Sequence, residues 1–103
     1  MATAQLKPGQ MLKPLLDARQ AAQAAVEFFR HLSAGMRVTE VGLEEVELTG
    51  DEKYWLVTLG FDSPPRKNLK LPDFLHIPVR KLKVFKVDAR TGKVVAMKIR
   101  AAE

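Results

Sequence analysis

The feature that most constrains the fold is the stretch of residues 80–100, RKLKVFKVDARTGKVVAMKIR, which predicts a β-hairpin. Before the turn, Val84, Phe85 and Val87 supply β-branched and aromatic side chains in a run too short for a convincing helix. Asp88 suits the first position of a type I turn, because its carboxylate can accept nearby backbone N–H groups. Gly92 suits a position with positive φ, where a Cβ would clash. We therefore predict a four- or five-residue connection with a bulge at Gly92.

Each strand of the hairpin has an apolar face. In the second strand the odd positions Val95, Met97 and Ile99 form it. The first strand has a conflict of phase, which either a bulge or partial cover on both faces would resolve. We expect Phe85 and Val87 inside. The three lysines of that strand are expected in water: Lys81, Lys83 and Lys86.

Upstream of the hairpin, residues 15–34 predict one helix with apolar side chains at spacings of three and four. Pro14 fits the first turn, where its missing N–H is no loss, and Gly35 fits a left-handed cap. Many of the apolar residues are alanines, which lets a helix lie close to a sheet. Phe28 or Phe29 would anchor its C-terminal end.

Two further strands follow the predicted helix. Residues 36–49 form the first, with a bulge at Glu44 and Glu45 where the apolar phase shifts. Residues 54–62 alternate regularly and should face the helix with their odd positions: Trp55, Val57, Leu59 and Phe61. Residues 63–79 are proline-rich and long for a connection, which indicates a functional loop or a covering flap.

Assembled, these elements predict an α+β fold in which one N-terminal helix packs on a four-stranded antiparallel meander sheet. Residues 1–14 are expected to be an extended arm, and residues 15–103 a single α+β domain. A length of 103 residues, with 47% hydrophobic and 28% charged residues, is ordinary for one folded domain. The apolar residues of the second sheet face, Tyr54 and Leu56 among them, leave room for a partner or a second copy to cover it.

The composition also excludes several classes of protein. No apolar run is long enough to span a membrane, and the N-terminus lacks the pattern of a secretory signal, so we expect a cytoplasmic protein. With no cysteine there is no disulfide framework and no thiolate nucleophile. The two histidines, His31 and His76, lie in no metal-ligand spacing. We therefore expect no catalytic residues, no metal site and no cofactor.

Charge is unevenly distributed along the chain. Residues 1–62 hold six Lys/Arg against nine Asp/Glu, whereas residues 63–103 hold eleven against three. The acidic and basic halves could neutralise each other across the fold, or they could form a dipolar surface that meets partners. The acidic cluster is expected to be a solvated edge rather than a metal or acid–base site: Glu40, Glu44, Glu45, Glu47, Asp51 and Glu52.

The run from Val87 to Val94, VDARTGKV, with Phe85 before it, resembles the signature end of PepSY-type domains. The order of a helix, a strand and then this hairpin is similar as well, and it agrees with a cystatin-like or PepSY-like fold. PepSY-type domains are small α+β modules for which inhibition or regulation of peptidases has been proposed. The resemblance implies a regulatory binding role and supplies no catalytic residues.

We thus expect a non-enzymatic binding or regulatory module that acts through protein–protein contacts. Its predicted surface is the 63–79 loop with the exposed sheet face, including Arg66, Lys67, Phe74 and Tyr54. One alternative is a nucleic-acid-binding protein that uses basic residues of the hairpin: Lys81, Lys83, Lys86 and Arg90. Another is a structural protein that self-assembles, for which a homodimer is the simplest form.

Overall fold

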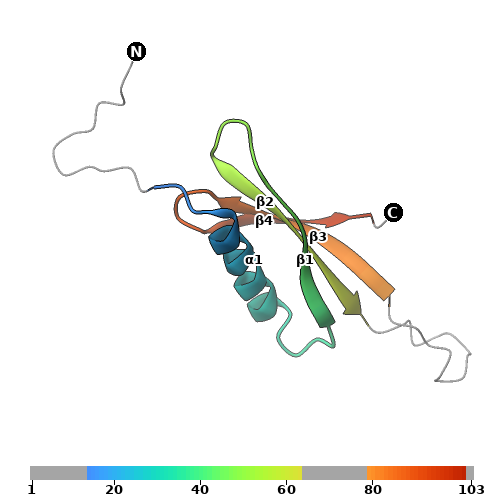
Figure 1. The fold of residues 1–103 in the computed structure, drawn as a ribbon. Helices are drawn as coiled ribbons and strands as arrows, with labels where there is room; N and C mark the ends of the chain where they lie inside the picture. The colour runs from blue at the N-terminus through green and yellow to red at the C-terminus, as the bar shows by residue number, and fades with distance from the viewer. Residues whose placement is uncertain (1–13, 64–78, 102–103) are drawn as a thin grey trace, which may run out of the picture.

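A computed structural model describes residues 14–63 and 79–101. It contains one helix, α1 (Ala18–Leu32), followed by four strands: β1 (Thr39–Leu48), β2 (Tyr54–Ser63), β3 (Val79–Asp88) and β4 (Val94–Arg100). The strands form one antiparallel sheet in the order β1-β2-β3-β4, and α1 lies on one of its faces (Figure 1). The predicted α+β meander is confirmed. Most of the predicted arm and of the 63–79 loop lies outside the described residues.

The helix begins later than the sequence pattern predicted. Asp17 is its N-cap: the carboxylate accepts the Gln20 N–H at 2.7 Å, and the Gln20 side chain accepts the Asp17 N–H at 2.9 Å. This reciprocal capping box starts the helix at Ala18, so the predicted start at residue 15 with Pro14 in the first turn is wrong. Leu16 is engaged elsewhere, because its N–H donates to the Ala89 carbonyl at 2.7 Å. At the other end Gly35 has a φ of 85°, the left-handed conformation expected of it.

The core forms between α1 and the odd positions of β2 and β3. Ala21 and Ala25 are fully buried, so the helix backbone lies close to the sheet. Phe29 is the aromatic anchor, with its ring centroid 4.8 Å from that of Phe61 and 5.8 Å from that of Phe85. The remaining buried members of the cluster are those predicted to face the helix: Val57, Leu59 and Val87.

Strand β1 contains two irregularities. The register shifts between Leu43 and Glu45, which confirms the predicted bulge. A second shift lies between Thr39 and Gly42, where Glu40 has a φ of 55°. A non-glycine residue rarely adopts this conformation, and the second bulge was not predicted. Together the two bulges make β1 an irregular edge of the sheet.

Strand β3 needs no bulge against β2, because the two pair without interruption from Ser63 opposite Val79 to Tyr54 opposite Asp88. Both faces are partly covered, and Phe85 is buried as expected. The bulge lies in β4 instead. Lys86 pairs with Ala96 and Val87 with Val94, which leaves Val95 as the extra residue.

The β4 bulge changes which residues enter the core. Val94 and Met97 pack against it, whereas Val95 is 48% and Ile99 85% exposed. Of the predicted apolar face of Val95, Met97 and Ile99, only Met97 packs on the core, since Val95 is the bulged residue and Ile99, opposite Lys83, is exposed. The bulge is at Val95 and not, as predicted, at Gly92. Gly92 lies in the turn and has a φ of 78°, which is the positive φ predicted for it.

Both hairpin turns meet the start of the helix at one end of the sheet. Asp88 Oδ1 accepts the N–H groups of Arg90 at 2.9 Å and Thr91 at 2.8 Å, the role predicted for this carboxylate. Ala89, at the same turn, donates its N–H to the Lys53 carbonyl at 2.9 Å. These contacts fix one end of the domain and leave the other end, beyond the last turn of α1, more open.

Candidate functional site

The helix is too short to cover the whole face on which it lies. Its 15 residues span about 22 Å, whereas the ten residues of β2 span about 33 Å. Because the start of α1 is fixed at the two hairpin turns, the uncovered part of the face lies beyond its C-terminus. A groove of about 210 Å³ occupies this place. It is lined by Phe29, Leu32, Ser33, Met36, Arg37, Val38, Phe61, Ser63, Lys81 and Lys83.

The floor and one wall of this groove are apolar. Phe29 and Phe61, in contact with each other, contribute their aromatic rings from the helix and from β2. Leu32 and Met36 flank the end of the helix and are 53% and 65% exposed. Large apolar side chains this exposed beside a cavity are typical of a surface that another molecule covers.

The rim of the groove is basic. Arg37 lies on the segment between α1 and β1, and Lys81 and Lys83 come from β3. Side chains alternate along a strand, so the odd positions of β3 share the face of the buried Phe85. The register places Lys81 opposite Phe61 and Lys83 opposite Leu59. Within the described part of the chain, the lining contains three cations and no carboxylate.

The same two lysines border a second hollow on the β4 side. It is lined by Arg80, Lys81, Leu82, Lys83, Ile99 and Arg100. Lys83 is paired with Leu59 on β2 and with Ile99 on β4. These three neighbouring side chains are, in order across the sheet, a buried leucine, a lysine and an exposed isoleucine. Lys81 and Lys83 therefore border both hollows.

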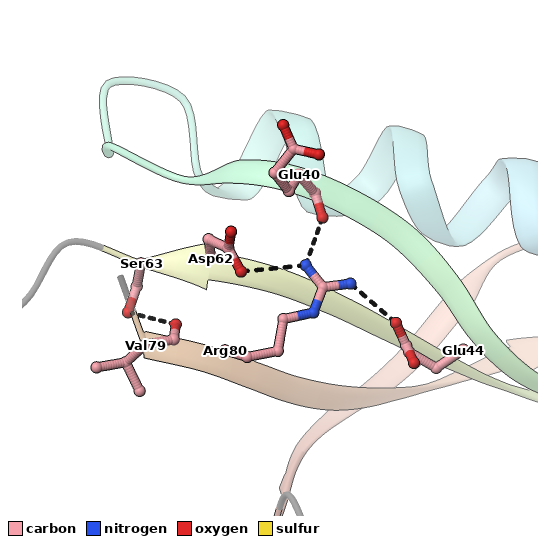
Figure 2. A network of polar contacts seen from close by, with 6 residues as sticks. All are labelled: Glu40, Glu44, Asp62, Ser63, Val79 and Arg80. Atoms are coloured by element: carbon pink, nitrogen blue, oxygen red, sulfur yellow. Dashed lines mark hydrogen bonds and ion pairs between the residues drawn. The ribbon is translucent and has the colours of Figure 1, made fainter. Parts of the chain in front are cut away.

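On the opposite face of the sheet, Arg80 joins the acidic and basic halves of the chain (Figure 2). Its guanidinium donates to the Glu40 carbonyl at 2.6 Å, to Glu44 at 2.8 Å and to Asp62 at 3.3 Å. The hydrogen bond to Glu44, followed by that to Asp62, raises the pKa of Arg80. Gly60 leaves room for this arrangement, because a Cβ there would lie 2.7 Å from the side chains of both Arg80 and Glu44.

A further ion pair, made by Arg100, lies on the same face. Arg100 donates to Glu45 at 2.6 Å and to the hydroxyl of the buried Thr58 at 3.2 Å. The two halves thus neutralise each other in part, one of the two roles that their charge asymmetry suggested. Nowhere in residues 14–63 and 79–101 do three or more His, Cys, Asp or Glu side chains gather as a metal site.

The structure separates the residues that the sequence proposed for partner binding. Tyr54 lies on the face opposite the groove, where Lys86 Nζ stands 4.3 Å from the centroid of its ring. The other three lie outside the described residues: Arg66, Lys67 and Phe74. Tyr54 consequently belongs to a different surface from the groove.

The alternative nucleic-acid set is divided between two faces and one turn. Lys81 and Lys83 are on the helix side of the sheet, and Lys86 is on the other side above Tyr54. Arg90 lies in the β3–β4 turn, beside Asp88, at the end remote from the groove. These four cations do not form one continuous surface.

Sequence reasoning missed the groove itself and most of its lining, including Leu32, Met36 and Arg37. One signal was available: Lys81 and Lys83 share the odd phase of Phe85 and Val87. Lysines in phase with core residues indicate that the covering helix stops short of them.

Within residues 14–63 and 79–101, fold and groove together define the class of protein: a small α+β domain whose helix α1 leaves a basic-rimmed apolar groove open on the sheet. No known family model matches the sequence, and neither a curated protein nor a solved structure matches it significantly. Across the described ranges, no helix combines the length and apolar character needed to cross a membrane.

Proposed function

We propose that this protein is a non-enzymatic binding module that captures an acidic segment of a partner protein, with an apolar residue of that segment seated in the groove. The observation that carries the proposal is an apolar cavity with three cations and no carboxylate among its described lining residues. This moves the working surface from the 63–79 loop and Tyr54 to the C-terminal end of α1. A regulatory role of the kind proposed for PepSY-type domains accords with such a site, through the resemblance of the VDARTGKV turn.

The size of the groove favours a side chain over a cofactor. Its volume of about 210 Å³ is below the roughly 300–1,000 Å³ typical of small-molecule pockets. One large apolar side chain, together with the exposed Leu32 and Met36, would bury surface that is now in water. Burial of such a side chain contributes about 1.5–3 kcal/mol.

The cations around the rim select the flanking residues of the ligand. Lys81 and Arg37 are exposed and Lys83 is half-buried, so each can meet a carboxylate at the surface. Exposed ion pairs contribute about 0.2–1 kcal/mol each and are weakened by salt. Affinity should therefore come from the apolar anchor, and selection of acidic sequences from the rim.

The test uses fluorescence anisotropy with a labelled peptide of sequence EDEFDED as the probe. We expect saturable binding that weakens when the central Phe becomes Ala and disappears for the basic peptide KRKFKRK. The double variant Lys81→Glu/Lys83→Glu should bind at least tenfold more weakly, because each attraction becomes a repulsion. The matched control is Lys93→Glu/Lys98→Glu, which makes the same charge change at exposed positions outside the groove lining.

If both double variants are folded by circular dichroism and lose affinity for the peptide equally, the loss reflects net charge alone. That result would refute the groove as the binding site. Absence of EDEFDED binding to the unmodified protein would refute it as well. A single-stranded oligonucleotide that binds at physiological salt, and more tightly than the peptide, would favour the nucleic-acid alternative instead.

A further inference from the structure

The two edges of the sheet differ in how well they are protected against pairing with another strand. The β1 edge carries two bulges, the positive φ of Glu40 and several carboxylates, all of which discourage a new strand. The β4 edge has one bulge, at its beginning, and is otherwise regular. Two of the large apolar side chains exposed on the domain, Val95 and Ile99, belong to β4.

We propose that two copies of the chain pair β4 with β4 in antiparallel orientation about a two-fold axis at Met97, which makes a continuous eight-stranded sheet. In this register Val95 of each copy lies opposite Ile99 of the other. The two most exposed apolar residues of β4 are therefore complementary to each other under the symmetry of a dimer. Val95 and Ile99 are equally spaced about Met97, which pairs them in a symmetric dimer. Binding to a different protein would not need this symmetry.

The charges of β4 are compatible with the same register. Lys98 lies opposite Ala96, and Ile99 faces the bulge at Val94 and Val95, so no like charges are directly paired between Ala96 and Ile99. Arg100 is already held by Glu45 of its own chain at 2.6 Å. The two Lys98 residues become diagonal neighbours about 7–8 Å apart, and their long side chains can diverge into water.

The dimer has a consequence for the proposed binding site. An antiparallel pair in one sheet has its two-fold axis perpendicular to the sheet, so both helices and both grooves face the same side. A ligand with two acidic segments would then bind both copies. The dimer itself does not depend on what the groove binds, and its test can succeed or fail independently.

The absence of cysteine from the sequence allows a direct test of the register. Two single-cysteine variants, Val95→Cys and Ile99→Cys, are prepared separately, mixed, and oxidised. In the mixed dimer the two cysteines are opposite each other, at a distance that a disulfide can bridge. In either variant alone the equivalent cysteines are offset by four residues, about 14 Å, which is too far. Leu43→Cys, exposed on β1, mixed with Ile99→Cys reports collisional cross-linking.

We expect the mixture of Val95→Cys and Ile99→Cys to cross-link at least tenfold more than either variant alone or the Leu43→Cys mixture. Equal yields in all samples would overturn the dimer, and preferential cross-linking of Ile99→Cys with itself would overturn the register. Sedimentation velocity of the full chain should show a concentration-dependent dimer. Ile99→Lys should weaken that dimer more than tenfold, while the control Leu43→Lys leaves it unchanged. A monomer at all concentrations would refute the proposal.

Discussion

Three glycines allow the cost of backbone conformation to be separated from the cost of crowding, through a series of Gly→Ala variants. Gly50 has no positive φ and open space around it, and Gly35 has a φ of 85° with open space. Gly92 has a φ of 78°, and a Cβ there would lie 3.3 Å from Leu16 Cδ1. Each substitution reduces the freedom of the unfolded chain by a similar amount, so the differences between variants report the folded state.

The expected magnitudes follow from these environments. Gly50→Ala should change the free energy of unfolding by less than about 0.5 kcal/mol. Gly35→Ala should cost about 1–2 kcal/mol more than Gly50→Ala, because a Cβ in the left-handed region approaches the following carbonyl. Gly92→Ala should cost about 1 kcal/mol beyond Gly35→Ala, because Leu16 must also move. The main chain of Leu16 is held by hydrogen bonds from its N–H to Ala89 and from Trp55 to its carbonyl, so the adjustment falls on its side chain.

The measurement is urea unfolding followed by the fluorescence of Trp55, the only tryptophan in the chain. Equal slopes with denaturant across the series would show that only stability has changed. If Gly92→Ala were no less stable than Gly50→Ala, the reasoning on both φ and packing would be wrong. If it matched Gly35→Ala, the contact with Leu16 would contribute nothing.

Two further predictions concern polar contacts. Trp55→Phe keeps the aromatic packing but removes the indole N–H that donates to the Leu16 carbonyl at 3.0 Å. Urea unfolding followed by circular dichroism, since this variant has no tryptophan, should show a loss of about 1–2 kcal/mol, and no loss would mean that water replaces the bond. For Asp88, hydrogen bonds from the backbone of Thr91 and then Arg90 lower the pKa of the carboxyl. Its stabilisation is therefore complete above about pH 4 and lost as the pH falls through the folded pKa, and Asp88→Asn should flatten that part of the stability profile; parallel profiles for the two proteins would refute the assignment.

The order of elements, their antiparallel pairing and the bulge at Glu44 could be predicted, because each depends on a local pattern. The strict alternation of β2 identified Val57 and Leu59 as core residues without reference to any neighbour. The start of the helix could also have been found, since Asp17 and Gln20 have the spacing of a capping box. Leu15 and Leu16 extend the apolar helical pattern toward the N-terminus, and this obscured the capping box at Asp17.

The phase of β4 could not be read from its sequence. Val94 and Val95 are equally suited to the core, and only pairing with β3 decides which of them is the bulged residue. The groove depends on tertiary structure in the same way. It exists because α1 ends before the sheet does, and no local pattern compares the length of a helix with that of the strands beneath it.

The bonds of Leu16 also have a consequence for how the domain is made. Leu16, just before the helix, donates a hydrogen bond to Ala89 in the β3–β4 turn. The two residues lie near opposite ends of the domain in the sequence. During translation the helix is synthesised before the strands. Ala89 and the buried face of β3, on which the helix packs, are synthesised only near the end. Until then the stripe of Ala21, Ala25 and Phe29 has only part of its cover. Completion of the domain should therefore wait for the final hairpin, and nascent chains that end before β3 should be the species that chaperones and proteases encounter.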